Sequence, residues 1–154
     1  MRILVFSDSH GDFTKMDKAV RMHKSAEVII FCGDGESDIE YIKRKYPDKM
    51  YICVRGNNDW ASSFNSTETV TIENKRIFIT HGHRYSVKAG LYTLVCAARE
   101  QKADIVVFGH THVPCTEYDD GLYILNPGSC HGYCSTFGYI DITDKGIMIN
   151  TVKI

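Results

Sequence analysis

The sequence predicts an α/β fold built as a two-sheet β-sandwich flanked by helices. The first half of the chain alternates short apolar runs with segments of helical spacing, which is typical of parallel strands joined by right-handed crossovers. The second half is richer in short strands and hairpins, which indicates a second sheet packed on the first. The length of 154 residues is that of one domain. We therefore expect a single domain over residues 1–154.

Three buried strands and two helices are expected in the first half. The strands are short, continuous apolar runs, and they cover Arg2–Ser7, Glu27–Cys32 and Met50–Val54. Apolar residues at helical spacing predict a first helix over about residues 13–24. A shorter helix runs from Ile39 to Tyr46 and is stopped by Pro47.

The second half is expected to begin with a hairpin, whose strands are Thr67–Ile72 and Arg76–Thr80. A helix over Ala89–Lys102 and a buried strand over Asp104–Phe108 follow it. Two more hairpins then turn at Asp119-Asp120-Gly121 and at Asp144-Lys145-Gly146.

Composition and charge exclude several classes of protein. Hydrophobic residues make up 44% of the chain and charged residues 24%, which excludes disordered, collagen-like and coiled-coil chains. A net charge of −1 excludes a chain-wide electrostatic footprint for nucleic acid or anionic membrane. No apolar run reaches the ~18 residues of a membrane span, and the first residues do not have the pattern of a signal peptide. We expect a cytoplasmic protein without a membrane association or a dedicated nucleic-acid-binding surface.

The six cysteines are expected to be reduced, because disulfides are rare in cytoplasmic proteins. Most of them fit the role of small buried hydrophobic residues. Cys130, His131 and Cys134 share one loop, but their spacing is not that of a zinc site, which usually has two Cys-x-x-Cys pairs. We assign this loop no role from the sequence.

Metal-capable side chains follow five successive predicted strands. They are Asp8 and His10, then Asp34, then Asn57 and Asn58, then His81 and His83, then His110 and His112. Ligands of open α/β sheets bind beyond the carboxyl ends of the strands, so these side chains are expected to point toward one another. We expect His110 and His112 to reach the same side of an extended segment.

Each position also has a structural interpretation. Asp8 or Asp34 alone is typical of a helix cap, and Asn57 after Gly56 is typical of a turn. A single buried histidine is more often a hydrogen-bonded polar residue than a ligand. These interpretations weaken jointly, because each would have to place a polar residue at a strand end by coincidence. A shared site is therefore the stronger hypothesis.

The ligand types indicate two transition-metal ions. Two carboxylates, one amide oxygen and four imidazoles suit Mn, Fe, Co, Ni or Zn better than Ca or Mg. Seven ligands are too many for one catalytic ion, which keeps an open position, whereas two ions that share a carboxylate fit the number. Such ions lie about 3.5–4 Å apart and clamp both oxygens of a displacement at phosphorus. We expect two divalent ions, with Mn first and Ni, Co, Fe or Zn as alternatives.

In this order the motifs resemble those of the calcineurin-like metallophosphoesterases, and most of all the small single-domain prokaryotic phosphodiesterases. The motifs are Asp8-x-His10, Gly33-Asp34, Gly56-Asn57-Asn58-Asp59, His81-Gly82-His83 and Gly109-His110-Thr111-His112. The resemblance extends from Arg2 to the closing hairpin. It implies a four-layer α/β/β/α fold and a single catalytic domain.

The resemblance also implies a role for each ligand. Asp8, His10 and His112 would bind the first ion, Asn57, His81 and His110 would bind the second, and Asp34 would bridge the two. The implied nucleophile is a metal-bridging hydroxide that attacks phosphorus in line. Asp34, Asn58 and His83 are the residues expected to act in catalysis, and Asp59 is expected to orient the ligands.

The sequence departs from the family pattern at two positions. Many members have a histidine where this chain has Asn58, and that histidine is thought to protonate the leaving group. Asparagine donates a hydrogen bond but is not a general acid. The segment after Asn126-Pro127-Gly128-Ser129 also lacks an arginine that often follows in relatives and could clamp a phosphate. His131 is a weak candidate for that task.

The predicted function is a dinuclear metal-dependent phosphodiesterase that hydrolyses small or activated phosphodiesters. The alternative is a non-catalytic metal-binding or protein-interaction scaffold of the same fold, similar to the retromer scaffold subunit. Such a scaffold tends to lose ligands, whereas this chain has a candidate at every ligand position. A nuclease would need added segments that grip DNA, and none is visible. The natural substrate, the physiological metal and the oligomeric state are left open.

Overall fold

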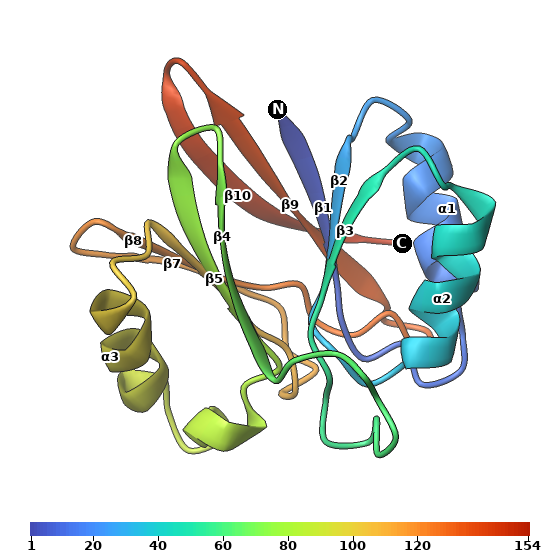
Figure 1. Cartoon of the computed structure of the whole chain (residues 1–154), viewed down its shortest axis with the longest axis horizontal. Coiled ribbons are helices and arrows are strands. Elements are labelled where there is room, and N and C mark those ends of the chain that lie inside the picture. The colour runs from blue at the N-terminus through green and yellow to red at the C-terminus, as the bar shows by residue number, and fades with distance from the viewer.

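Two five-stranded sheets face each other in the computed structural model, which describes residues 1–154 (Figure 1). The first sheet contains β1 (Arg2–Phe6), β2 (Val28–Phe31), β3 (Met50–Cys53), β9 (Thr136–Thr143) and β10 (Gly146–Lys153), in the order β10-β9-β1-β2-β3. The second contains β4 (Thr67–Ile72), β5 (Lys75–Thr80), β6 (Ile105–Val107), β7 (Cys115–Asp119) and β8 (Leu122–Asn126), in the order β4-β5-β6-β8-β7.

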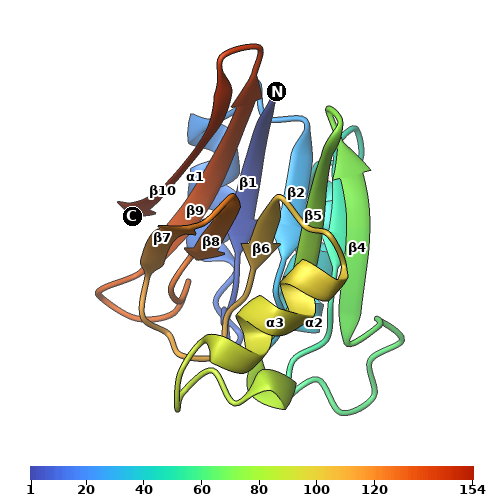
Figure 2. The same ribbon diagram turned by 90° about the vertical axis from the view of Figure 1, so that its left-hand side faces the viewer.

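Helices cover the outer face of each sheet. The first sheet is covered by α1 (Thr14–Met22) and α2 (Glu36–Lys45), and the second by α3 (Tyr92–Glu100), which lies in front of its sheet in Figure 2. None of the three helices has the length and apolar character needed to span a membrane. The layers therefore run helix, sheet, sheet, helix, which confirms the predicted fold class.

The central strands β1, β2 and β6 are buried on both faces, which explains their continuous apolar sequences. In β1, Ile3 and Val5 belong to the core between the two sheets, whereas Leu4 and Phe6 pack beneath α1 and α2. This alternation follows from the two-residue period of a strand. A third core lies between α3 and the second sheet. The sheets are thereby fixed relative to each other and to their helices.

The last hairpin joins the first sheet, and this corrects the expectation that the strand-rich second half would supply the second sheet. β9 pairs antiparallel with β1, with Ile140 opposite Ile3. Phe137 packs beneath the helices, while Ile140 and Ile142 enter the core between the sheets. This strand is thus buried on both faces like its neighbour, and its sequence does not specify which sheet it joins.

Parallel pairing brings the strand ends together. β1 is parallel to β2 and β2 to β3, while β5, β6 and β8 are parallel to one another. The carboxyl ends of both sets lie at the lower end of the molecule in Figure 1. The predicted site residues all belong to the loops at this end.

Element boundaries agree with the predictions to within a few residues. α3 begins at Tyr92 rather than Ala89, and a short 3-10 helix (η1, His83–Tyr85) lies ahead of it. The hairpin between β4 and β5 turns at Glu73 and Asn74, which both have positive φ angles.

Candidate metal centre

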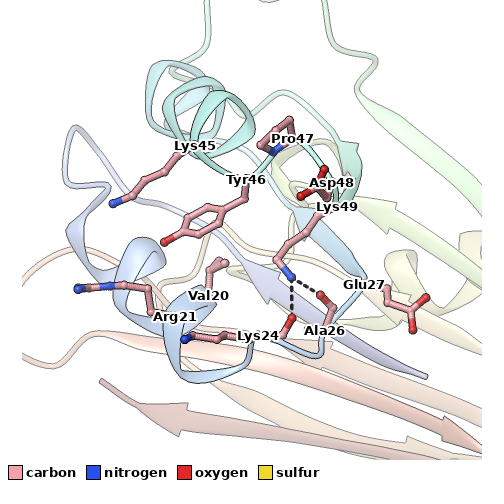
Figure 3. A pocket seen from close by; sticks show the side chains of 10 residues that line it. All are labelled: Val20, Arg21, Lys24, Ala26, Glu27, Lys45, Tyr46, Pro47, Asp48 and Lys49. Carbon is pink, nitrogen blue, oxygen red and sulfur yellow. Dashed lines mark hydrogen bonds between the residues drawn. The ribbon is translucent and has the colours of Figure 1, made fainter.

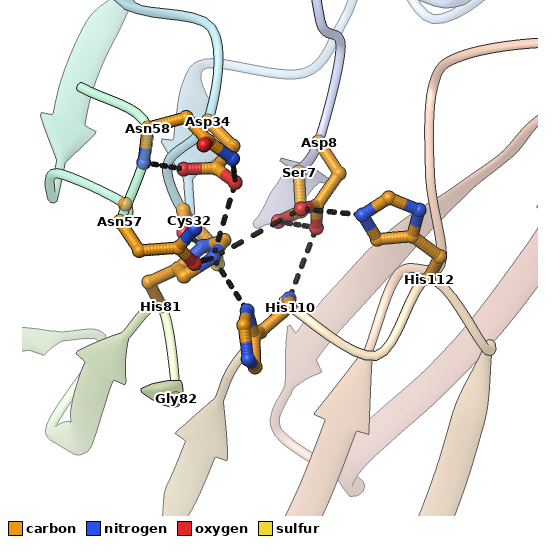
Figure 4. Close-up of polar contacts among 12 residues, drawn as sticks. Ser7, Asp8, Cys32, Asp34, Asn57, Asn58, His81, Gly82, His110 and His112 are labelled. Atoms are coloured by element: carbon orange, nitrogen blue, oxygen red, sulfur yellow. Dashed lines mark hydrogen bonds and ion pairs between the residues drawn. The ribbon is translucent and has the colours of Figure 1, made fainter. Parts of the chain in front are cut away.

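The seven predicted metal ligands converge at the carboxyl ends of the strands. They come from the loops that follow β1, β2, β3, β5 and β6. In Figure 4, Asp8 lies in the middle of the cluster, with His112 on one side and Asp34 and His81 on the other. Residues far apart in the sequence thus form one polar cluster.

One group of facing ligand atoms belongs to Asp8, His10 and His112. The Nε2 atom of His112 lies 3.0 Å from Oδ1 of Asp8, and Nε2 of His10 lies 3.7 Å from the same oxygen. The two imidazole nitrogens are 3.3 Å apart. These three residues are the ones that the resemblance assigns to a first ion.

A second group of facing ligand atoms belongs to Asp8, Asp34 and His81, all of them buried. Nε2 of His81 lies 3.5 Å from Oδ2 of Asp34 and 4.0 Å from Oδ1 of Asp8. Oδ1 of Asn57 and Nδ1 of His110 lie 3.1 and 3.2 Å from the same imidazole nitrogen. Asp8 is common to both groups, whereas the bridging role of Asp34 stays a prediction.

The tautomer of the neutral His81 ring follows from its backbone partner. Its Nδ1 atom lies 2.7 Å from the carbonyl oxygen of Cys32. A carbonyl oxygen only accepts, so Nδ1 carries the hydrogen and Nε2 of the neutral ring is an acceptor. This acceptor faces the carboxylate oxygens of Asp8 and Asp34. A histidine held by a carbonyl in this way is typical of metal ligands.

The cluster fits divalent cations. Oδ1 of Asp8 is buried and accepts no hydrogen bond, although three imidazole nitrogens face it at 3.0 to 4.0 Å. A buried carboxylate oxygen without a donor is costly unless a positive charge compensates it. Mixed carboxylate, amide and imidazole donors are those that Mn, Fe, Co, Ni and Zn accept. The donor set and its orphaned oxygen therefore suit such ions.

Backbone conformation at the site is unusual. Five of the predicted ligands have positive φ angles between 45° and 67°: Asp8, His10, Asp34, His110 and His112. Non-glycine residues seldom adopt this region, and such strained positions concentrate at functional sites. The expected extended segment at His110 and His112 is therefore wrong. Both residues adopt a left-handed backbone conformation instead, and Nδ1 of His110 lies 3.2 Å from Nε2 of His81 while Nε2 of His112 lies 3.0 Å from Oδ1 of Asp8.

Asp59 fixes the loop that carries Asp34. Its carboxylate accepts four backbone N–H groups, from Asp34 and Gly56 at 2.8 Å, Gly35 at 3.0 Å and Glu36 at 3.1 Å. Burial acts to raise the pKa of Asp59, but these hydrogen bonds outweigh it and lower the pKa. Asp59 touches no predicted ligand side chain and acts through the backbone.

Two glycines of the motifs are required because neighbouring side chains approach their backbone closely. A Cβ atom on Gly56 would collide with the carboxylate of Asp34, and one on Gly109 would collide with the side chain of Ser7. Ser7 Oγ donates to Oδ2 of Asp8 at 2.5 Å, and the backbone N–H of His110 donates to the same oxygen at 3.0 Å. These glycines therefore allow the loops to reach ligand distance.

Neither predicted carboxylate caps a helix. The residues before α1 and α2 are Phe13 and Gly35, and no side chain caps either helix. Asp38 instead accepts hydrogen bonds from Ser9 Oγ at 2.6 Å and from the backbone N–H of Gly11 at 2.8 Å, which ties the first loop to α2. No sequence signal indicates this role, because Asp38 falls within a helical pattern.

Asn58 and His83 lie beside the ligands. The backbone N–H and the Nδ2 amide of Asn58 donate to the carboxylate of Asp34 at 2.8 and 2.5 Å. The ring of His83 is centred 5.4 Å from that of His81, and its Nδ1 atom is buried without a partner. Burial and the neighbouring His81 lower the pKa of His83. His131 is farther out, with its ring 6.2 Å from that of His10.

A separate cavity of about 430 Å³ lies at the C-terminal ends of α1 and α2, away from the strand-end loops (Figure 3). Its Lys49 donates to the carbonyl oxygens of Lys24 and Ala26. Lys45 and Arg21 pair with Asp17 at 2.7 and 3.3 Å. The charged groups of Lys49, Lys45 and Arg21 are thus already paired within the protein, where they stabilise the ends of the two helices.

Comparison with known proteins identifies the family of the chain. Residues 1–145 match the family model described as the calcineurin-like phosphoesterase superfamily domain. The chain belongs to this superfamily. The expectation of a metal-dependent phosphoric ester hydrolase is thereby confirmed.

Two curated members of the superfamily are similar over most of their length. The chain is 33% identical to the probable metallophosphoesterase YsnB of Bacillus subtilis, over 84% of this chain and 75% of that one. It is 31% identical to a phosphodiesterase of Methanocaldococcus jannaschii, over 94% and 95% of the two chains. The fold also matches a crystal structure of a Vps29 mutant from Entamoeba histolytica, with a TM-score of 0.77 and 21% identity. The match covers 100% of this chain and 99% of that one. The last likeness shows the fold alone.

Proposed function

We propose that this calcineurin-like phosphoesterase is a phosphodiesterase with a dinuclear metal centre that hydrolyses small or activated phosphodiesters. The observation that carries the proposal is the presence of two adjoining groups of facing ligand atoms, one of Asp8, His10 and His112 and one of Asp8, Asp34 and His81. One catalytic ion would use only part of the seven ligands, whereas two ions use them all.

We assign Asp8, His10 and His112 to one ion. Asn57, His81 and His110 are assigned to the other, with Asp34 as the bridge. When bound, the two ions supply Lewis-acid catalysis and positive charge for an in-line displacement at phosphorus. The donor set mixes oxygen and nitrogen without sulfur and suits Mn, Fe, Co, Ni and Zn, and manganese is the ion we expect first. The cytoplasmic location and the single catalytic domain over residues 1–154 stay predictions.

The chain's own residues prepare the site and limit its chemistry. The carbonyl of Cys32 orients the imidazole of His81, and Asp59 holds the backbone on either side of Asp34. Asn58 is exposed beside Asp34 and has an amide that can donate to a phosphate oxygen. It cannot transfer a proton, so leaving groups that depart as stable anions are favoured. This preference supports a diesterase, as does the name of the M. jannaschii relative.

The test combines metal content with turnover. We expect the purified protein, after manganese loading, to hold up to two ions by elemental analysis and to hydrolyse bis-p-nitrophenyl phosphate. Chelation should abolish the activity, and a panel of Mn, Ni, Co, Zn and Mg should identify the preferred ion. Metal content well below one ion, together with activity that survives chelation, would overturn the proposal.

The alternative function is a protein-interaction scaffold, and the likeness to Vps29 is compatible with it at the level of the fold. The complete ligand set favours the enzyme, since a scaffold has no need of strained ligands. A protein that binds the ions but turns over no ester in the panel would support the scaffold instead.

A further inference from the structure

Two exposed aromatic residues stand on loops that also carry or adjoin the predicted ligands, and neither contributes to a core. Trp60 is the single tryptophan of the chain and exposes 89% of its surface, and Tyr133 is fully exposed. Large aromatic side chains bury much apolar area when they pack, so leaving two of them in water gives up that stabilisation. Their places in the fold indicate what they could contact.

Trp60 lies next to the second group of ligands. It is the next residue after Asp59 and the second after Asn58, so its Cα atom is within about 8 Å of the Asn58 Cα atom. The backbone N–H of Ser62 donates to the carbonyl of Asp59 at 3.2 Å and closes the turn that holds Trp60. The loop on which it stands is therefore fixed by Asp59.

Tyr133 lies next to the first group. Its loop is anchored at its start by two hydrogen bonds. Ser129 Oγ donates to the carbonyl oxygen of Asp8 at 2.8 Å, and the backbone N–H of Cys130 donates to the carbonyl oxygen of Ser7 at 3.0 Å. His131, two residues before Tyr133, has its ring 6.2 Å from that of His10. The two aromatic residues thus stand on loops beside different groups of ligands.

This arrangement matches the shape of a phosphodiester, in which two ester arms leave the phosphorus in different directions. We propose that Trp60 and Tyr133 stack against the bases of nucleoside phosphodiesters whose phosphate lies at the metal centre. Stacking is tolerant of sequence because every base has a π-face. The inference rests on the proposed function and adds the substrate class: small nucleotide diesters rather than diesters with aliphatic arms.

Trp60 provides a direct binding signal, since no other tryptophan contributes to the fluorescence. In protein loaded with zinc, a slowly hydrolysed dinucleoside phosphorothioate should quench this fluorescence saturably. Dimethyl phosphate at the same concentration should not. Quenching that is equal and non-saturable for both compounds would contradict a base-binding site.

A kinetic comparison uses two substrates with the same leaving group, thymidine 5′-p-nitrophenyl phosphate and methyl p-nitrophenyl phosphate. The readout is the ratio of their kcat/KM values. Trp60→Ala and Tyr133→Ala together should lower this ratio about 5- to 100-fold, because the single base of the thymidine ester loses its stacking contact. Trp60→Phe should keep most of it. Tyr92→Ala is the matched control, because Tyr92 is 83% exposed but lies on α3.

The outcomes separate this inference from the proposed function. If the double variant hydrolyses both esters with the wild-type ratio, the inference is wrong and the phosphodiesterase stands. If wild-type protein hydrolyses neither ester with any of the metals, the proposed function is wrong. The fluorescence titration then decides alone whether the aromatic pair binds nucleotides.

Discussion

At the scale of single residues, two nearby carboxylates have different tasks. Asp34 presents its Oδ2 atom to Nε2 of His81 at 3.5 Å, so its charge faces the place where the ions are proposed to bind. Asp59 turns both oxygens toward backbone N–H groups. We therefore expect Asp34 to act in the chemistry, whereas Asp59 fixes the conformation of the loop.

We expect Asp34→Asn to lower the phosphodiesterase activity more than Asp59→Asn does. Loss of a residue that only orients ligands typically costs about 10–100-fold. We expect the opposite order for stability, because the amide introduced by Asp59→Asn would set its own donors against backbone N–H groups. Measurements of kcat/KM and Tm on both variants check this, and comparable activity losses would contradict the role of Asp34.

We propose that Asn58 limits the leaving groups that the site can expel. An activated aryl diester departs without a proton, whereas an alkyl monoester gains from a general acid, typically by about 10²–10⁴-fold. We expect Asn58→His to raise monoesterase activity relative to diesterase activity, measured as kcat/KM for both ester classes. Asn58→Gln is the control, since it keeps the amide. A wild-type preference for alkyl monoesters would refute the leaving-group argument.

At the scale of elements, α1 and α2 are joined by one buried carboxylate. Asp17 of α1 accepts a hydrogen bond from the hydroxyl of Tyr46 at 2.7 Å and pairs with Lys45 at 2.7 Å. Both partners lie at the end of α2. The helices are thus tied at the end that faces away from the metal centre.

We expect Asp17→Asn to lower the free energy of unfolding by about 1–3 kcal/mol, because it breaks a buried charged hydrogen bond. The activity of the folded protein should not change. Glu40→Gln removes the more exposed ion pair with Lys43 and should cost at most about 1 kcal/mol. Urea unfolding of the three proteins at neutral pH is the measurement.

The same carboxylate gives a pH dependence. Burial acts to raise the pKa of Asp17, but the hydrogen bonds from Lys45 and Tyr46 outweigh it and lower the pKa below 3.8. A lowered pKa means that the stabilisation is complete above this ordinary value and is lost as the pH falls through the folded-state pKa. The stability difference between wild type and Asp17→Asn should therefore shrink only below about pH 4. A difference that is already lost at pH 6 would contradict the assignment.

At the scale of the whole molecule, metal binding is coupled to stability. Without ions, the orphaned oxygen of Asp8 is an unfavourable feature at the junction of the two sheets. Ions that bind only the folded state stabilise it, by about 2.7 kcal/mol at a concentration of one hundred times Kd. The site is therefore built at some cost to the metal-free fold.

We expect manganese to raise the Tm of the wild-type protein and to raise that of Asp8→Asn by a smaller amount, because the variant loses a ligand of one of the two proposed ions. We also expect metal-free Asp8→Asn to be at least as stable as metal-free wild type, because the substitution removes an uncompensated buried charge. Thermal unfolding with and without chelator measures both effects. A metal-free variant that is several degrees less stable would show that Asp8 has a structural task of its own.

Much of this protein is determined by its sequence alone. The apolar runs and helical spacings predicted the elements and the two-sheet sandwich, because burial on both faces leaves a local pattern that can be read without partners. The seven ligand candidates could be named because each directly follows a strand, and parallel strands bring their ends to one edge. Their types already indicated transition metals.

Tertiary structure decided what depends on contacts between distant segments. The pairing of β9 with β1 joins residues near the two ends of the chain, and its sequence would suit either sheet. The left-handed conformations of His110 and His112, the four N–H groups gathered by Asp59 and the shared position of Asp8 exist only once the loops are packed together. Side-chain type is local, but the orientation of a lone pair and the distance between two ligands depend on the whole fold.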